Sequence, residues 1–329
     1  MRTMTYLSGA DVEAIALTDE EILDAVGGVL AAQGRGEAVL EPRTHIFPHG
    51  AKGHFNVLRG AVPGVAGVKV VGDYVDNHLR GLPSELALLV LMDPDCGAPT
   101  AVLDATAITE MRTGAVTAIG ARHLARRRAR VLGHVGACGT AYWNVRLLAR
   151  VLPELEEIRV HSLRPASREA FAARLSRDLD RPVAAVGSWR ECLDGADVLV
   201  EASRLTEPCA LLATEWVAPG SLTVPYGTVS AVAIDLTDVM DKIVVDDWAQ
   251  AGAGPLGALR AHVDSGRLTA ERVHAELGQI VCGERPGRER DDERILLWHR
   301  GLSICDIALG CALLRAARER GIGTELPYR

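Results

Sequence analysis

A glycine-rich stretch at residues 129–146 constrains the fold of this chain more than any other feature. A short apolar run enters it, glycines stand at positions 133, 136 and 139, and a helix-compatible segment leaves it. This order is typical of a dinucleotide-binding turn, because glycines let the backbone approach a pyrophosphate and the helix N-terminus presents free N–H groups. The usual fingerprint is G-x-G-x-x-G, whereas Val135 stands at the second glycine position. An ordinary strand-to-helix turn therefore stays open as the alternative.

The middle of the chain repeats this pattern of an apolar run followed by a helical segment. From Arg130 onwards, short apolar runs alternate with segments of helical pattern. Such alternation indicates right-handed βαβ units and a parallel sheet. The predicted strands are 130–132, 158–161, 183–186, 197–201, 221–224 and 242–246. The fold class that follows is α/β, with a Rossmann-type parallel-sheet domain.

The flanking segments have a different character. The pattern predicts helices within 8–33, with Thr18 as an N-cap, a long helix over 108–126, and a helical tail from Ile295 to about Arg318. Strands are predicted at 38–40, 65–71, 85–92 and 100–103, the last two joined as a hairpin through the turn at 93–97. The front of the chain is thus expected to be an α+β unit with antiparallel strands.

Composition limits the class of protein. With 329 residues the chain has room for two domains, and its net charge of −7 argues against a general nucleic-acid binder. Seven cysteines form no C-x-x-C pair, which favours a reducing compartment. We find no signal-peptide pattern and no apolar run approaching about 18 residues, so we expect a soluble cytoplasmic protein without membrane contact. No set of side chains has a recognised metal-ligand spacing.

Several segments together resemble the ornithine cyclodeaminase and mu-crystallin family. Residues 103–115 match its D-x-x-x-I-T-x-x-R-T-x-A pattern, and residues 42–44 and 67–71 look like its segments that carry a substrate-binding arginine and an active-site lysine. Further matching segments follow in order, so that the resemblance covers residues 8 to 318: 196–198, 206–208, 216–220 and 275–278. It implies a discontinuous substrate-binding and dimerisation domain at 1–126 and 295–329, a Rossmann-like NAD(P)-binding domain at 127–294, and a homodimer.

Three cationic side chains stand at the family's substrate positions. The resemblance implies that Arg112 binds the substrate carboxylate and that Arg43 is a second contact, and a guanidinium fork suits that task. Lys69 lies in the apolar segment 65–71, where desolvation lowers an amine's pKa and suits it to acid–base work. The alternative for Lys69 is a strand lysine that points to solvent.

Two positions depart from the family pattern. Val229 stands where the family's cyclodeaminases carry an aspartate, and a valine neither accepts a proton nor pairs with an ammonium group. His299 is a candidate catalytic acid–base group in its place, with a buried structural histidine as the alternative. We therefore rank an imine reductase or amino-acid dehydrogenase, with hydride transfer at Cα, above a cyclodeaminase that forms a cyclic amino acid. A non-catalytic NADPH-binding protein is a further alternative.

The cofactor-binding residues are expected in the glycine turn and at two strand ends. The candidates are Gly133, His134, Gly136, Cys138, Gly139, Ser162, Arg164 and Thr228. NAD-preferring proteins usually place an acid at the end of the second strand, whereas this chain has Ser162, Arg164 and Arg168 there. The sequence thus favours NADP over NAD, and a small α-amino or α-imino acid as substrate.

Overall fold

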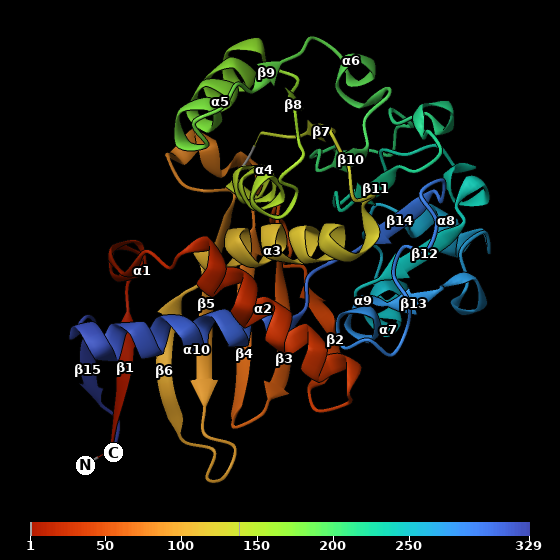
Figure 1. Cartoon of the computed structure of the whole chain (residues 1–329). Helices are drawn as coiled ribbons and strands as arrows, with labels where there is room; N and C mark the ends of the chain where they lie inside the picture. Colours follow the sequence, from red (N-terminus) through yellow and green to blue (C-terminus); the bar gives the residue numbers. More distant parts are fainter. Residues whose placement is uncertain (1, 138) are drawn as a thin grey trace. The chain divides into compact units, whose positions relative to one another are not determined.

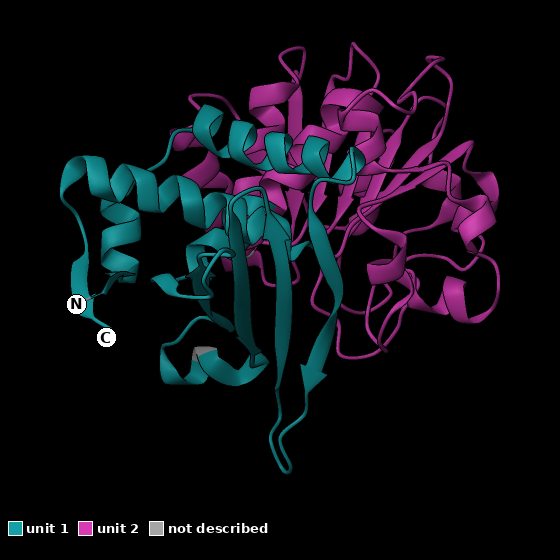
Figure 2. Ribbon diagram, turned by 90° about the horizontal axis from the view of Figure 1, so that it is seen from below, with its two compact units in different colours: residues 1–112, 301–329 teal, residues 113–300 magenta. Residues whose placement is uncertain are grey.

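The computed structural model describes residues 2–137 and 139–329. The chain divides into two compact units (Figure 2): unit 1 comprises residues 1–112 and 301–329, and unit 2 comprises residues 113–300. Unit 1 carries a mixed sheet and unit 2 a parallel sheet. The α/β fold class predicted from the sequence is confirmed.

The sheet of unit 1 has the order β15-β1-β6-β5-β4-β3-β2. Its neighbouring strands are antiparallel except for β1 and β6. The predicted hairpin is confirmed as β5 and β6, whereas β1, β3 and β15 were not predicted. The strands are β1 (Thr3–Leu7), β2 (Val39–Ile46), β3 (His54–Val62), β4 (Val65–Asp73), β5 (Glu85–Met92), β6 (Pro99–Asp104) and β15 (Thr324–Pro327).

Helices cover one face of this sheet. In Figure 1, α10 (Ser303–Arg320) runs across the strands beside α2 (Asp19–Gly34). Thr18 caps α2 as predicted, because its hydroxyl accepts from the Glu21 N–H while the Glu21 carboxylate accepts from the Thr18 N–H. The other helical segments are α1 (Gly9–Ile15), a 3₁₀ turn at Val75–Arg80, and α3 (Thr106–Leu124), which continues into unit 2.

Unit 2 is built on a parallel sheet of order β13-β12-β14-β11-β10-β7-β8-β9. The chain goes outward from β7 to β8 and β9, then returns to the other side of β7 to form β10, so a topological switch point lies between β7 and β10. Ligands of such sheets bind outside the carboxyl ends of the strands at this point. The strands are β7 (Val131–Val135), β8 (Glu157–His161), β9 (Ala184–Ala185), β10 (Val198–Glu201), β11 (Leu222–Pro225), β12 (Lys242–Val245), β13 (Ala275–Glu276) and β14 (Ile295–Trp298).

Helices alternate with these strands as the βαβ pattern predicts. They are α4 (Gly139–Val151), α5 (Pro165–Asp178), α6 (Trp189–Leu193), α7 (Trp248–Gly252), α8 (Arg260–Asp264) and α9 (Leu277–Val281), with 3₁₀ turns at Thr214–Trp216, Leu236–Val239 and Ala270–Arg272. Among the described residues, no helix is both long and apolar enough to cross a bilayer.

The tail corrects one prediction. Residues 295–298 form strand β14 between β11 and β12, not the start of a helix. All four side chains of β14 are buried, and a short continuous apolar run does not distinguish a buried strand from a helix. Gly301 then adopts a φ of 85°, and α10 begins only at Ser303.

Candidate functional site

Lys69 lies in the middle of β4 and points towards α10. Alternation along β4 places Lys69 with the buried Val71, whereas the exposed Val70 occupies the other face of the sheet. The Lys69 side chain is 1% exposed. Its Nζ donates to Asp306 Oδ1 at 2.5 Å and to Thr109 Oγ1 at 3.0 Å. The alternative of a lysine that points to solvent is therefore wrong.

Arg112 and Arg43 converge on the turn that precedes α10. Arg112, on α3, donates from Nε to the same Asp306 Oδ1 at 3.0 Å. A side chain at Gly301 would overlap the Arg112 guanidinium, so the glycine admits this close approach. Arg43, on β2, donates from Nη2 to the Gly301 carbonyl at 2.9 Å. Unit 1 thus brings together the three cationic residues that the sequence singled out.

Asp306 was missed by the sequence interpretation, although it holds the cluster together. It lies one turn into α10 and is fully buried, and its Oδ1 accepts from both Lys69 and Arg112. Its Oδ2 has no hydrogen-bond partner among the described residues. The available signal was an acid between Ile304 and Ile307 in the apolar first half of the helix, since an acid buried in such a place needs a cationic partner.

The electrostatics of this cluster set the charge of Lys69. Burial lowers the pKa of Lys69 to about 8, because a desolvated ammonium is costly; Asp306 opposes this shift and the Arg112 charge adds to it. The lysine is therefore protonated at neutral pH, but its pKa is close enough for proton exchange in that range. The cluster can hold a carboxylate on Arg112 and exchange a proton at Lys69.

The glycine turn of unit 2 has the geometry that a dinucleotide requires. Gly136 adopts a φ of 116°, and a Cβ there would lie 2.6 Å from the Ala202 carbonyl oxygen. Gly133 lies inside β7, where a side chain would overlap the Cys192 backbone. Helix α4 begins at Gly139, so its N-terminus follows the turn directly at the switch point. Cys138 lies outside the described residues.

His134 lies in β7 itself, not in the turn that follows it. The residue is fully buried, and burial lowers its pKa to about 4, so its ring is neutral. The sequence predicts His134 as a cofactor-binding residue of the glycine turn, whereas the structure places it in strand β7 with its side chain buried.

The end of β8 carries no acidic residue. His161 ends the strand, Ser162 follows, and Arg164 is the N-cap residue of α5 with an exposed side chain. Arg168 Nη1 donates to the Ser162 carbonyl at 3.4 Å, which folds this arginine back over the strand end. Two guanidinium groups therefore lie at this end of the strand.

His299 lies at the carboxyl end of β14 and is 1% exposed. Its Nε2 is 2.8 Å from Thr117 Oγ1, and its ring stacks on Tyr226 at a centroid distance of 5.1 Å. The Tyr226 hydroxyl accepts from Asn144 Nδ2 on α4 at 3.1 Å. Thr228 is exposed in the loop after β11. The residues after β11 and β14 thus connect to the helix that leaves the glycine turn.

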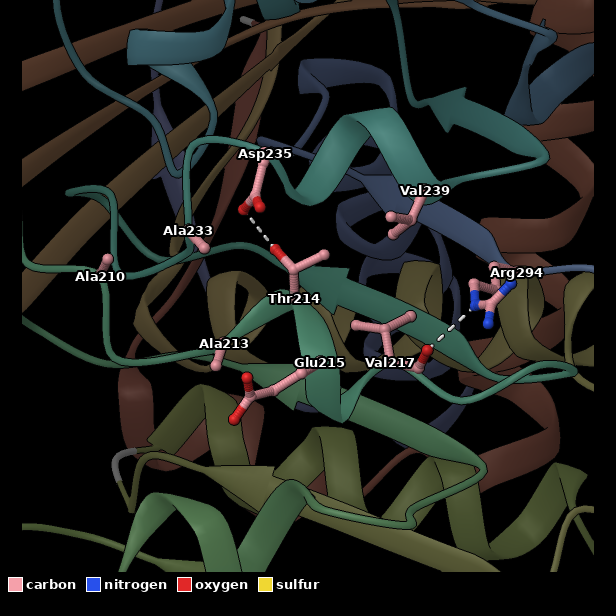
Figure 3. A pocket seen from close by; sticks show the side chains of 9 residues that line it. All are labelled: Ala210, Ala213, Thr214, Glu215, Val217, Ala233, Asp235, Val239 and Arg294. Atoms are coloured by element: carbon pink, nitrogen blue, oxygen red, sulfur yellow. Dashed lines mark hydrogen bonds between the residues drawn. The ribbon is translucent and has the colours of Figure 1, made fainter.

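A separate pocket of unit 2 lies near the amino ends of the strands (Figure 3). Val217, Val239 and Arg294 line it, and each stands shortly before the first residue of a strand. Asp235 in the same pocket accepts from the Thr214 hydroxyl at 2.5 Å. Because dinucleotides bind at the carboxyl ends of strands, we do not assign the cofactor to this pocket. Among the described residues, no group of three or more His, Cys, Asp or Glu side chains could hold a metal ion.

Comparison with known proteins places these features in a family. The sequence model of the ornithine cyclodeaminase/mu-crystallin family matches residues 2–320. The chain is 31% identical to an alanine dehydrogenase of Archaeoglobus fulgidus over 326 residues, which cover 98% of each protein.

Two solved structures are similar over the whole chain. The Thermococcus litoralis Delta(1)-pyrroline-2-carboxylate reductase in complex with NADH and L-proline has a TM-score of 0.92 at 28% identity, covering 98% of this chain and all of that one (100%). An archaeal alanine dehydrogenase dimer with bound NAD has a TM-score of 0.91 at 28% identity, covering 100% of both chains.

Proposed function

Because the chain belongs to the ornithine cyclodeaminase/mu-crystallin family, we propose that it is an NAD(P)-dependent oxidoreductase acting at the Cα–N centre of a small α-imino or α-amino acid. The observation that carries this proposal is the buried cluster in which Lys69 and Arg112 share one oxygen of Asp306. The relatives named as an alanine dehydrogenase and a pyrroline-2-carboxylate reductase support the same class of reaction.

In this proposal unit 1 is the substrate-binding unit. Arg112 binds the substrate carboxylate through its guanidinium fork, with Arg43 as the second contact. Imine reduction requires a proton at nitrogen, and Lys69, with its pKa at about 8, holds one at neutral pH. Asp306 keeps the two neighbouring cations charged although all three groups are buried. His299 is the second candidate acid–base group.

Unit 2 is proposed to bind the dinucleotide, and its geometry fits that group. Gly136 has a positive φ and packs its backbone closely against Ala202, and the N-terminus of α4 at Gly139, which follows the turn, would hold the pyrophosphate. Thr228 is exposed at the end of a neighbouring strand. The nicotinamide, when bound, supplies or accepts the hydride.

We infer a preference for NADP(H) from the end of β8. An acid there would bind the ribose 2′-hydroxyl of NAD and repel a 2′-phosphate. Ser162, Arg164 and Arg168 stand there instead, and a guanidinium suits a phosphate. The structures cited above contain NAD or NADH, so the proposed preference for NADP(H) rests on the residues of this chain alone.

We also infer a homodimer through the uncovered face of the unit 1 sheet. This face, opposite α10, carries five apolar side chains that are between 38% and 61% exposed: Val39, Ile46, Val70, Leu86 and Leu88. Val70 and Leu88 are cross-strand partners at its centre. Exposed apolar side chains gathered on one sheet face indicate an interaction surface, and the archaeal alanine dehydrogenase is a dimer. Leu88→Lys should yield monomers in analytical ultracentrifugation; a wild-type protein that is already monomeric would contradict the inference.

The decisive experiment measures reduced cofactor consumption. The purified protein is mixed with NADPH or NADH and either a cyclic ketimine, such as pyrroline-2-carboxylate, or pyruvate with ammonia. Lys69→Met should lower kcat/KM by about 100-fold or more, in the range of positioned acid–base groups. Lys52→Met, at a lysine whose side chain is 87% exposed, is the matched control and should leave the rate unchanged.

The alternatives make opposite predictions. A cyclodeaminase would convert ornithine to proline and ammonia with catalytic NAD and no net NADH, and this outcome would reverse our ranking. A non-catalytic NADPH-binding protein would bind nucleotide while Lys69→Met changed no turnover. The loop after β11 supports the reductase, because the side chain of Val229 cannot act on an amine.

A further inference from the structure

A carboxyl group lies at the centre of the unit 2 sheet, outside the roles assigned above. Glu201 is the last residue of β10, and its register partners are Val135 of β7 and Pro225 of β11. It therefore stands beside the switch point, at the carboxyl edge where a dinucleotide binds. The Glu201 side chain is fully buried.

The Glu201 carboxyl joins two loops that border this edge. Its Oε1 accepts from the Ser203 backbone N–H at 2.7 Å and from the Ser203 hydroxyl at 2.5 Å. On the other side, a Cβ at Gly227 would lie 2.8 Å from Glu201 Oε2, so the carboxyl packs directly against the Gly227 backbone. Within the described residues, Oε2 has no partner that satisfies hydrogen-bond geometry. The loops after β10 and β11 thus depend on one buried acid.

In the part of the chain that the structure describes, no ion pair compensates this acid, in contrast to Asp306. Burial raises the pKa of Glu201 to about 7 and outweighs the two hydrogen bonds from Ser203 and the nearby Gly227 backbone, which favour the charged form. The paired residues Val135 and Pro225 do not titrate. Next to them along the chain, the titratable side chains are His134, which burial keeps neutral, and Tyr226.

We propose that Glu201 is a positioning residue of the dinucleotide crevice: it holds the loops after β10 and β11, and where it is ionised in the free protein it takes up a proton from water when the dinucleotide binds. This proposal rests on the proposed nucleotide function. A pyrophosphate brings negative charge to the same strand ends, and an ionised carboxylate in a desolvated place resists that charge. The dinucleotide therefore binds more tightly to the protein in which Glu201 is protonated.

Proton uptake on binding determines how the affinity for the dinucleotide changes with pH. If the bound state holds more protons than the free state, affinity falls as pH rises through the pKa of the free protein, which for Glu201 is about 7. The probe is NADH, because its pyrophosphate does not titrate in this range whereas the 2′-phosphate of NADPH has a pKa near 6. Fluorescence titrations between about pH 6 and about pH 8.5 should show the Kd for NADH rising by about tenfold or more.

Variants assign the effect to Glu201. Glu201→Gln mimics the neutral acid, so its Kd should stay near the low-pH wild-type value across the range, and calorimetry in buffers of different ionisation enthalpy should show its proton uptake lost. Glu215→Gln, at an exposed glutamate of the same unit, should follow the wild type. Ser203→Ala removes a donor to the charged form, so the midpoint of the pH dependence should move to higher pH.

Two outcomes separate the possible failures. If NADH binds to the wild type with a Kd that does not change with pH, or if Glu201→Gln retains the wild-type pH dependence, the role of Glu201 is wrong while the nucleotide site stands. If NADH does not bind to the wild type at any pH, the dinucleotide assignment itself fails, and the role of Glu201 with it.

Discussion

The Asp306 cluster of unit 1 and the central strands β7 and β10 of unit 2 bury ionisable side chains in opposite ways, although unit 2 also contains a buried ion pair between Lys242 and Glu293. In unit 1, Asp306, Lys69 and Arg112 are all buried, and the two cations share a carboxylate oxygen. In unit 2, Glu201 and His134 are buried and have no ion-pair partner among the described residues. Burial therefore raises the pKa of Glu201 and lowers that of His134, and both shifts favour the neutral form. Burial alone therefore does not determine charge. The compensating partner decides whether a buried group stays ionised.

This difference matches the tasks proposed for the two units. A cluster that must bind a substrate carboxylate and exchange a proton needs fixed charges, and Asp306 maintains them. A crevice that receives an anionic pyrophosphate is better lined by neutral groups and backbone N–H groups. Substitutions in each unit test whether this difference in charge compensation has measurable consequences.

The largest effect is expected from Asp306→Ala. Removing one partner of a buried ion pair leaves uncompensated charge, which costs about 3–5 kcal/mol. Here both Lys69 and Arg112 would lose their shared carboxylate, so the free energy of unfolding in urea should fall by about this amount. Lys69→Met combined with Asp306→Leu removes the Lys69–Asp306 pair as a whole and should be less destabilising than Asp306→Ala. Equal losses would show that the ion pairing does not matter.

Glu201→Gln should raise the free energy of unfolding, in contrast to Asp306→Ala. The folded pKa of about 7 lies above the ordinary glutamate value of 4.5, so the folded protein binds more protons between these values and the wild type loses stability as pH rises through this window. Glutamine carries no such penalty. The variant should match the wild type near pH 4.5 and exceed it by about 3 kcal/mol near pH 8. Urea unfolding at both pH values measures this difference, and a variant less stable than wild type at pH 8 would contradict it.

Arg112→Lys should separate charge from geometry in unit 1. Lysine keeps a cation beside Asp306 but loses the planar fork that binds a carboxylate bidentately. A hydrogen bond to a charged group is worth about 1.5–3 kcal/mol, so kcat/KM should fall by about 100-fold, mainly through KM. Arg35→Lys, at an arginine whose side chain is 50% exposed, is the control. A change confined to kcat would indicate that Arg112 acts on the reacting nitrogen instead.

The sequence predicted unit 2 better than unit 1 for a physical reason. Parallel strands of a βαβ unit lie close in sequence, and each is a short apolar run between helices. Strand β14 was not predicted, because four consecutive apolar residues show neither the period of a helix nor that of a half-buried strand. In unit 1, β15 closes the sheet beside β1, although the two strands lie at opposite ends of the chain. Such a pairing leaves no local signal.

The site shows the same limit. Arg43, Lys69 and Arg112 could be identified from the sequence because they lie within matching motifs. Their shared partner could not, since Asp306 follows Lys69 by 237 positions and nothing local relates them. Glu201 was read as the end of an apolar strand, and only the packing of Gly227 against its carboxyl reveals its place in the fold.

The smallest effect is expected at the outer strands of unit 2, where a charge can be added without burying it. Ser162→Asp places a carboxylate at the end of β8, where it can accept from a ribose 2′-hydroxyl and repel a 2′-phosphate. The ratio of kcat/KM for NADPH to that for NADH should fall by about tenfold, which corresponds to about 1.4 kcal/mol. Ser162→Ala is the control, because it removes the hydroxyl without adding charge and should change the ratio less. If both variants shift the ratio equally, the hydroxyl and not the charge at this strand end selects the cofactor. If neither does, Arg164 and Arg168 become the residues to test, and the contrast between the charge-compensated Asp306 cluster and the uncompensated Glu201 does not extend to the end of β8.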